Sequence, residues 1–223
     1  MWCVPEVNPE YIAKMEDVLA LYEKAHNPQE PVVCFDEKPV VLHADVRNPQ
    51  PYRSGVIAKR DSEYKRRGTA NVFCAVEPKA GRHFTRPTRN RSAVEFAKAI
   101  DQLAARYPCA RTIHLVVDNL NIHCRKSLVG HFGEEKAALL WGRFTLHYTP
   151  KHGSWLNQAE IEIGLFSRQC LGSRRIPDLP TLRTEAKAWN QRINRDRIMI
   201  DWKFTRRDAH AVFHYQTNLF TRS

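Results

Sequence analysis

Three carboxylates occupy positions from which they could act together on a phosphate ester. Asp36 and Asp118 each follow a short apolar run, VVCF and IHLVV respectively. Glu160 lies in the first turns of a helix that a loop rich in aromatic and polar residues introduces. Short apolar runs of this kind predict buried strands. If the two strands lie side by side and parallel, both aspartates emerge at the same sheet edge, where the glutamate could join them.

Such a set predicts metal-dependent phosphodiester chemistry. Carboxylate oxygens are the hard ligands that Mg²⁺ and Mn²⁺ prefer, and two ions about 3.5–4 Å apart can activate an attacking oxygen and stabilise a leaving one. Asp36, Asp118 and Glu160 are therefore the candidate catalytic residues and the candidate ligands of two Mg²⁺ or Mn²⁺ ions. Each aspartate alone could equally be a solvated turn residue. Glu162 is two positions from Glu160, so at most one of these two glutamates should face the metals.

Several polar residues near these carboxylates are candidates for orienting the ligands: Asn119, Asn121, His123 and Asn157. The first three could instead do no more than shape the turn after the strand. A zinc site from His147, His152 and Cys170 is not expected, because their spacing fits no standard zinc motif.

The charge balance predicts a polyanionic partner. The chain of 223 residues has a net charge of +11 and a pI of about 9.6, and excess Lys and Arg suits phosphate contacts. A basic surface without a partner is the alternative. Basic clusters at 59–67, 82–91 and 192–207 are expected to flank the acidic site. The residues expected to contact double-stranded DNA are Arg82, Arg86, Arg89, Arg91, Lys151, His152, Arg206 and Arg207.

The elements that must position these residues can be read from capping signals and hydrophobic periods. We expect strands at 32–35, 40–46, 70–76, 113–117 and 144–148, and helices at 8–25, 92–107, 126–140, 154–170 and 182–193. Residues 47–69 read as an elaborated hairpin, and 81–91 show no hydrophobic period. The order α–βββ–α–β–α–β–α–α matches a ribonuclease-H-like α/β fold, in which a mixed five-stranded sheet carries helices on both faces.

The composition indicates the cellular environment of the protein. Six cysteines lie scattered without a CxxC pair, which indicates a reduced environment with neither a disulfide framework nor a zinc finger. No apolar run approaches bilayer length and no signal peptide opens the chain, so we expect a cytoplasmic protein without a membrane partner. We expect an N-terminal helix and linker at 1–30, a catalytic domain at 31–208 and a basic, aromatic tail at 209–223.

Five motifs in order carry a family resemblance: VVCFDE at 32–37, GTANVF at 68–73, VVDNLNIH at 116–123, HYTPKHGSWLNQAEIE at 147–162 and SRQCL at 167–171. Together they resemble DDE transposases of the mariner superfamily, in its bacterial insertion-sequence (insertion-sequence-630-like) branch, over residues 30–205. The resemblance implies metal-dependent DNA strand cleavage and strand transfer at element ends, typically into TA targets. It also implies a homo-oligomer on DNA, associated with the bacterial nucleoid. Glu160 matches the catalytic acid of the family, which leaves Glu162 as a structural or surface residue.

One departure from the family concerns recognition of the element ends. The family carries helix-turn-helix modules ahead of the catalytic domain, whereas one helix precedes Asp36 here. We therefore expect the recognition half to be missing or to be a separate subunit. Two other functions stay open: a ribonuclease-H-like nuclease without strand transfer, and a non-catalytic DNA-binding remnant of a transposase.

Overall fold

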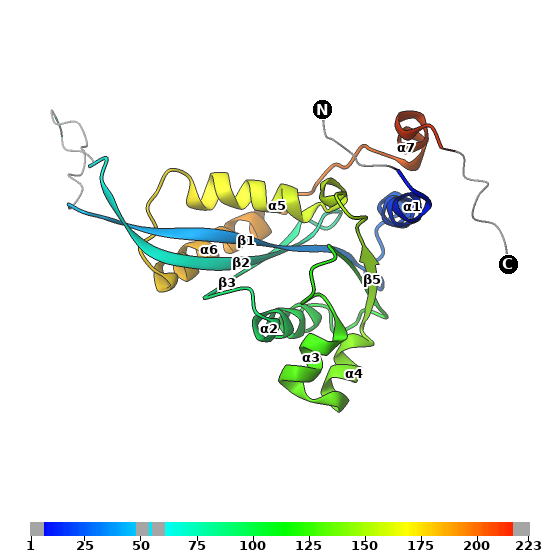
Figure 1. The fold of residues 1–223 in the computed structure, drawn as a ribbon, viewed down its shortest axis with the longest axis horizontal. Helices are drawn as coiled ribbons and strands as arrows, with labels where there is room; N and C mark the ends of the chain where they lie inside the picture. Colours follow the sequence, from blue (N-terminus) through cyan, green and yellow to red (C-terminus); the bar gives the residue numbers. More distant parts are fainter. Residues whose placement is uncertain (1–6, 48–53, 55–60, 216–223) are drawn as a thin grey trace.

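One mixed sheet forms the centre of the computed structural model, which describes residues 7–47, 54 and 61–215. Its strand order is β3-β2-β1-β4-β5 (Figure 1). The strands are β1 (Val32–Asp45), β2 (Tyr64–Glu77), β3 (Arg82–Thr88), β4 (Ile113–Val117) and β5 (Phe144–Tyr148). β2 pairs antiparallel with β1 and β3, while β4 runs parallel to β1 and β5. The predicted mixed five-stranded α/β sheet is confirmed, although two of its strands differ from the prediction.

The first difference is that β1 is one long strand, where the sequence predicted two strands separated near Pro39. Proline usually ends a strand because it lacks the N–H that the ladder needs. β1 pairs with β4 only over Val32–Cys34, so beyond that point no strand among the described residues pairs with its second edge. Pro39 is paired with Asn71 of β2 within the continuous strand. Asp36 therefore lies inside a strand, at the level where β4 has ended, and not at a strand end.

The second difference is β3, which lies in the segment that shows no hydrophobic period. Its side chains do alternate. Phe84 packs in the core with α2 (Ala93–Ala104), whereas the side chain of His83 pairs with Glu162 and that of Thr85 accepts a hydrogen bond from Asn190. Because polar contacts replace apolar ones on one face, the strand carries no hydrophobic alternation that could be read from the sequence.

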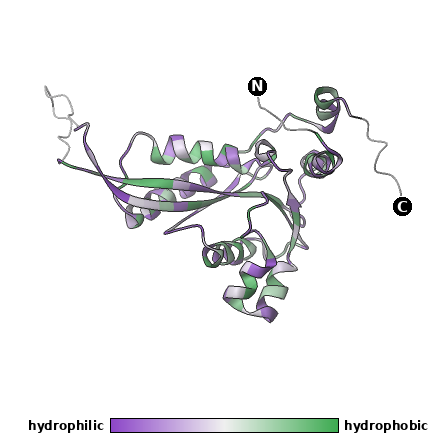
Figure 2. Cartoon of the chain, viewed as in Figure 1, coloured by the Kyte–Doolittle hydropathy of each residue, from purple (hydrophilic) through white to green (hydrophobic). Residues whose placement is uncertain are grey.

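Helices cover both faces of the sheet, as predicted. The α-helices are α1 (Pro9–Glu23), α2 (Ala93–Ala104), α3 (Arg125–Phe132), α4 (Glu134–Trp141), α5 (Ala159–Phe166), α6 (Leu179–Asp196) and α7 (Arg206–Phe213). α2, α3 and α4 pack on one face, and α1, α5 and α6 on the other (Figure 1). Figure 2 shows hydrophobic and hydrophilic residues alternating along α2 and α5, which fits helices with one buried side. No helix in the described ranges is long and apolar enough to span a bilayer.

The helices differ from the prediction in three places. The helix expected at 126–140 is divided at Gly133, whose φ of +80° lies outside the helical region. The helix expected from Ser154 is a short 3-10 turn (Ser154–Leu156) followed by α5 and then a π-helical segment (Ser167–Leu171). α7 was not predicted, and the expected domain boundary at 208 falls inside it. Thr205 and Asp208 form a reciprocal capping box there, a signal the sequence does contain.

Candidate active site

The register of the two parallel strands places Asp36 and Asp118 side by side. Cys34 of β1 pairs with Val116 of β4, so Asp36, two positions further along β1, is level with Asp118, which directly follows the end of β4. Cys34 and Val116 both pack in the cluster formed with α1 and the start of α5. Because side chains alternate with a period of two, Asp36 and Asp118 point to that same face.

Glu160 reaches this place from the first turn of α5, and the buried amide of Asn157 attaches the beginning of this helix to β1. Asn157 is 1% exposed. Its Oδ1 accepts a hydrogen bond of 3.1 Å from the N–H of Ala159, which closes a tight turn directly before the helix. Its Nδ2 donates to the carbonyl oxygen of Phe35 at 2.9 Å and, more weakly, to Oδ2 of Asp36 at 3.4 Å. Asn157 therefore fixes the helix that carries Glu160 relative to the strand that carries Asp36.

A buried histidine connects Asp118 to a fourth carboxylate on the opposite face of β1. Nδ1 of His123 lies 2.7 Å from Oδ1 of Asp118, and its Nε2 lies 3.2 Å from Oε2 of Glu37. The His123 side chain is fully buried, and its ring contacts the rings of Phe35 and Phe96. Burial opposes a charge on this imidazole, but the hydrogen bonds to Asp118 and Glu37 outweigh it and raise the pKa of His123 to about 9. The imidazolium therefore holds Asp118 in place at neutral pH.

The environments of the carboxylates shift their pKa values in opposite directions. Burial, followed by the charges of Glu37, Asp118 and Glu160, raises the pKa of Asp36 to about 7. Burial also acts to raise the pKa of Asp118, but the hydrogen bond and charge of His123 outweigh it and lower that pKa. The pKa of Glu160 is raised by burial and by the charge of Asp118, against the opposing charge of Lys38. The three carboxylates thus lie within electrostatic range of one another.

The donor set fits a divalent cation. Three carboxylates from three elements offer hard oxygen ligands to Mg²⁺ or Mn²⁺. Their mutual repulsion is the kind of cost that a cation placed among them removes. Within the described ranges, no three His, Cys, Asp or Glu side chains are already drawn together as a complete metal-ligand set. Repulsion between like charges favours this separation.

Comparison with known proteins identifies the family. A family model described as "DDE superfamily endonuclease" matches residues 31–183. The chain belongs to the DDE superfamily of endonucleases. No curated protein sequence matches the chain.

Solved structures of the Mos1 mariner transposase have a similar fold. The paired-end complex with Mn aligns with a TM-score of 0.54 at 13% identity over 88% of this chain and 61% of that one. The paired-end complex with Mg aligns with a TM-score of 0.53 at 13% identity, over 96% of this chain and 62% of that one. The strand transfer complex aligns with a TM-score of 0.55 at 12% identity, over 88% of this chain and 60% of that one. The endonuclease therefore spans about three fifths of these transposase chains. Together with the sheet order, this likeness confirms the predicted fold class.

Further polar residues predicted from the sequence lie in the loops of the endonuclease that follow β4 and β5. Asn119 donates from Nδ2 to the carbonyl oxygen of Thr149 at 2.7 Å, which connects the loops that follow β4 and β5. Asn121 is exposed, and its carbonyl oxygen accepts a hydrogen bond from Cys124 Sγ at 3.2 Å. Lys151 and His152 are exposed in the turn between β5 and α5, where His152 has a φ of +62°.

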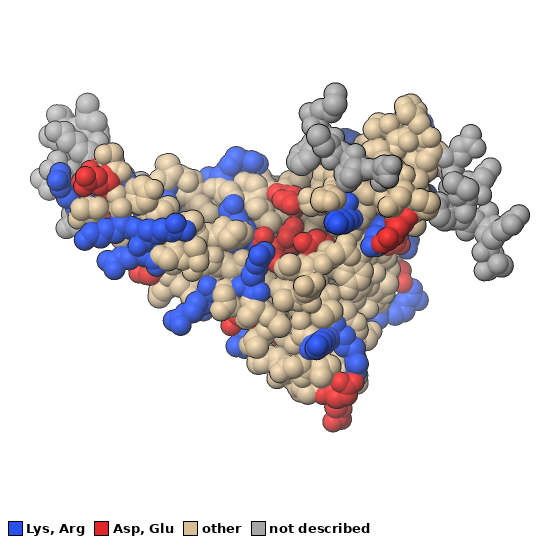
Figure 3. Space-filling model, viewed as in Figure 1, with Lys and Arg blue, Asp and Glu red and all other residues tan. Residues whose placement is uncertain are grey.

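The predicted DNA-contacting arginines divide among different surfaces. Arg91 is exposed, and its charge contributes to the lowered pKa of Asp118, so it lies near the site; Arg89 is exposed two residues earlier. Arg82 and Arg86 instead belong to the face of β3 that packs towards α2. Arg206 and Arg207 are exposed at the beginning of α7, where Arg206 forms an ion pair with Glu23 of α1. Figure 3 shows acidic side chains gathered where β1 passes beneath the beginning of α5, with basic side chains around them.

Sequence reasoning missed two charged residues of the site, Glu37 and Lys38. Both follow Asp36 directly, so their position in the VVCFDE motif was the only available signal. Glu37 alternates to the opposite face and meets His123, an interaction that depends on the tertiary fold. Lys38 returns to the face of Asp36, and its charge acts on Glu160.

Glu162 is a structural residue and not a surface one. Its side chain and that of His83 are both fully buried, with Oε2 of Glu162 2.7 Å from Nδ1 of His83. Nε2 of His83 lies 2.8 Å from the carbonyl oxygen of Ile198 and must donate to it. The pair therefore ties α5 to β3 and to the chain after α6, on the side of the helix away from Asp36.

Proposed function

We propose that Asp36, Asp118 and Glu160 form the active site of a transposase catalytic domain, which cleaves DNA strands and transfers them at the ends of an insertion element. The observation that carries this proposal is the meeting of three carboxylates from β1, from the end of β4 and from the first turn of α5. Membership of the DDE endonuclease superfamily supports it.

Divalent cations, Mg²⁺ or Mn²⁺ bound as a pair, are the cofactors we infer for these carboxylates. When bound, they would supply Lewis-acid stabilisation of the attacking and leaving oxygens. The residues of the chain prepare this environment. Asn157 and His123 orient Asp36 and Asp118, and Lys38 and Arg91 place positive charge where a phosphodiester would approach.

The finer assignments follow from the sequence motifs. We infer that the chain belongs to the bacterial insertion-sequence branch, acts as a homo-oligomer on double-stranded DNA, and inserts at TA targets in the nucleoid. Helix-turn-helix modules, in the same protein or in a partner subunit, would read the element ends. A hydrolytic nuclease and a non-catalytic DNA-binding remnant are the competing functions.

The test is a plasmid-nicking assay with Mg²⁺ on the parent, on Glu160→Gln and on Glu135→Gln, with helix-turn-helix modules added in trans if the parent alone is silent. Glu160→Gln keeps the shape of the side chain and removes the charge of a ligand, so nicking should fall by at least about 100-fold. Glu135 is an exposed glutamate on α4 and serves as the matched control, with unchanged nicking expected. Full activity in Glu160→Gln would place the third ligand elsewhere.

A second assay separates strand transfer from hydrolysis. Pre-cut element ends are incubated with a target plasmid, and joined products are counted. Joining in the parent but not in Asp118→Asn supports the transposase. Nicking without any joining would instead favour the hydrolytic nuclease, and the absence of both in the parent would favour the remnant.

A further inference from the structure

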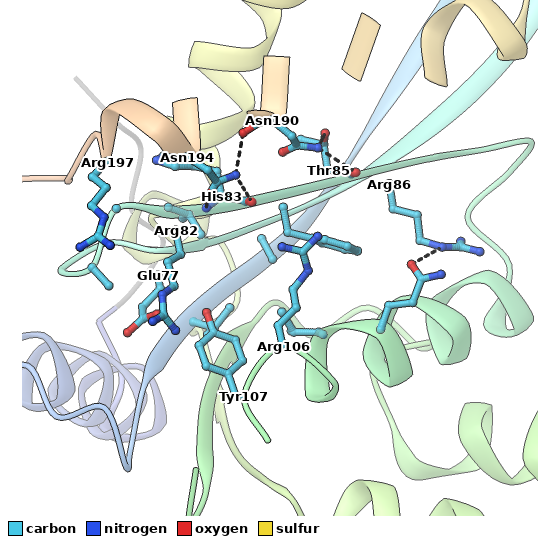
Figure 4. A pocket seen from close by; sticks show the side chains of 18 of the residues that line it. Glu77, Arg82, His83, Thr85, Arg86, Arg106, Tyr107, Asn190, Asn194 and Arg197 are labelled. Carbon is cyan, nitrogen blue, oxygen red and sulfur yellow. Dashed lines mark hydrogen bonds and ion pairs between the residues drawn. The ribbon is translucent and has the colours of Figure 1, made fainter. Parts of the chain in front are cut away.

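A groove with a volume of about 1350 Å³ follows the outer strand β3 between α2 and α6 (Figure 4). Its floor is the segment from Gly81 to Pro87, and its two walls are the C-terminal half of α2 with the turn after it, and the exposed side of α6. It lies two strands from Asp36, because Asp36 pairs with Cys74 and Cys74 pairs with Thr85.

Side chains of α6 already occupy part of the free backbone edge of β3. Asn194 accepts from the N–H of His83 and donates to its carbonyl oxygen, both at 2.8 Å. Asn190 donates to the carbonyl oxygen of Thr85 at 3.2 Å. Asn190 and Asn194 are four residues apart along the helix, a rise of about 6 Å, and Thr85 and His83 are two residues apart along the strand, a rise of about 6.6 Å. The two amides are therefore spaced to match the backbone groups that they contact. A partner that adds a strand to this edge is therefore disfavoured, and the groove must recognise its ligand through side chains.

Those side chains are strongly basic. Seven of the residues that line the groove are Lys or Arg, and one, Glu77, is acidic. Arg86 is neutralised by Glu95 at 2.5 Å, and Arg82 lies 3.7 Å from Glu77. Four further cations have no carboxylate within ion-pair distance among the residues that the structure describes: Arg106, Arg183, Lys187 and Arg197. Like charges gathered in this way favour binding of an anion.

The positions of these cations along the groove suit a chain of phosphates. Figure 4 shows Arg197, Arg82, Arg106 and Arg86 following one another along β3. Arg197, with a left-handed φ of +47°, is brought close by Gly81, where a Cβ would lie 2.6 Å from the Arg197 carbonyl group. The spaced row matches a repeating polyanion better than a single phosphate.

The aromatic residues of the groove are not available to nucleobases. The Arg82 guanidinium lies 5.6 Å from the centre of the Tyr107 ring, and that of Arg106 lies 4.7 Å from the centre of the Phe84 ring. Both rings are almost fully buried. Stacking of bases, the usual way to hold a single strand, is therefore not offered, which leaves contacts with a phosphodiester backbone.

The groove and the acidic site open on different sides of the molecule. In Figure 4, α1 lies to the left of the sheet, whereas in Figure 1 it lies to the right, so the groove is seen from the side opposite to the acidic patch of Figure 3. A straight duplex that lies over Asp36 would not also enter the groove.

We propose that this groove binds the backbone of a second DNA duplex, separate from the duplex at the acidic site. The inference rests on the proposed function in one respect, because an assembly that joins DNA segments must hold more duplexes than the one at a single acidic site. Contacts of this kind are independent of sequence and weaken as salt rises.

The experiment measures how many short blunt duplexes the full chain binds, and how the affinity depends on salt. The test variant is Lys187→Glu combined with Arg106→Glu, both exposed positions on opposite walls of the groove. The control is Lys126→Glu on the exposed side of α3. Thermal melts establish that each variant is folded. We expect two duplexes per parent chain and per control chain, and one per double variant, with a salt slope that is smaller by about 1 for each phosphate that the variant no longer binds.

Two duplexes on the double variant, with the same salt slope as the parent, would overturn the proposal. So would the loss of all DNA binding in the double variant, because the groove would then be the main path to the acidic site. Stronger competition by a structured RNA than by duplex DNA would overturn it too, by assigning the groove to another nucleic acid. The change in the number of bound duplexes supports the proposal for the groove whether or not the parent nicks DNA. The nicking assay tests the proposed function separately.

Discussion

Replacing Asp36 by Asn should stabilise the folded chain in a metal-free buffer, although the same change should abolish cleavage. Burial of the Asp36 carboxylate, and then the charges of three other carboxylates, raise its pKa from an ordinary 3.8 to about 7. The folded state therefore resists the ionised form that the unfolded chain adopts freely at neutral pH. An uncharged side chain of the same shape removes that cost.

The magnitude follows from the pKa. At about 1.36 kcal/mol for each pH unit, raising the pKa from 3.8 to about 7 costs the folded state about 4 kcal/mol once the pH exceeds 7. The asparagine can still accept from the N–H of Glu37, but its amide would face that of Asn157 and lose the weak 3.4 Å hydrogen bond. The lost hydrogen bond costs the variant about 1 kcal/mol, so its free energy of unfolding should exceed that of the parent by about 3 kcal/mol.

The dependence on pH gives the prediction its sign. Below about pH 4 the aspartic acid is protonated in both states, so the parent and the variant should unfold with similar free energies. As the pH rises from 4 to 7, the unfolded chain releases this proton and the folded chain retains it, so the parent loses stability. Urea unfolding with a chelator at pH 4 and pH 8 measures the difference, which should be near zero at the lower pH and about 3 kcal/mol at the higher.

The matched control is Asp201→Asn, because Asp201 is exposed and pairs only with exposed Lys203 among the described residues. Its free energy of unfolding should change by less than about 1 kcal/mol. Mg²⁺ should then stabilise the parent and leave Asp36→Asn nearly unaffected, since binding to the folded state adds to its stability. A variant less stable than the parent at pH 8, or a difference that does not vary with pH, would refute this account of the site.

Two further changes test the bonds that hold α5. Glu162→Ala leaves the buried His83 without its carboxylate partner and should cost about 3–5 kcal/mol of unfolding free energy. The glutamine of Glu162→Gln can donate to His83 Nδ1, so that variant should cost only about 1 kcal/mol. Equal urea midpoints for the two variants would show that the contact between His83 and Glu162 does not stabilise the fold. Asn157→Ala removes the turn that leads into α5 and the bond to β1, so it should cost about 2–3 kcal/mol. It should also reduce nicking at a temperature where the variant remains folded, which a purely structural role would not predict.

The parts of the fold that the sequence predicts are those in which one local rule acts alone. The apolar runs at 113–117 and 144–148 form β4 and β5, and Asn8 and Ser92 cap α1 and α2 as expected. Local rules failed where a tertiary contact replaced the usual one. Pro39 interrupts no ladder because β4 has already ended beside β1. β3 buries His83 against the carboxylate of Glu162 and Thr85 against the amide of Asn190, instead of against aliphatic groups. Neither circumstance can be read within a short window of sequence.

The same division applies to the site. The positions of Asp36, Asp118 and Glu160 follow from strand and helix signals, and the structure brings them within electrostatic range, while their roles remain proposals. The partners of His123 could not be derived, because Glu37 and Asp118 come from two strands that meet only in the folded sheet. The locations of Arg82 and Arg86 likewise depend on which face of β3 each side chain takes.

The acidic site combines groups that repel one another with groups that hold them in place, and the two sets are chemically separate. Repulsion arises among carboxylates of β1, β4 and α5. The restraint comes from three buried contacts: Asn157 joins α5 to β1, His123 joins the loop after β4 to β1, and His83 joins α5 to β3 through Glu162. Removing a carboxylate charge should therefore relieve repulsion without disturbing the restraint, and breaking a restraint should lose stability while the charges remain. If the proposed cations bind there, a site of this design holds its carboxylates ready for them at a cost in stability that binding would recover.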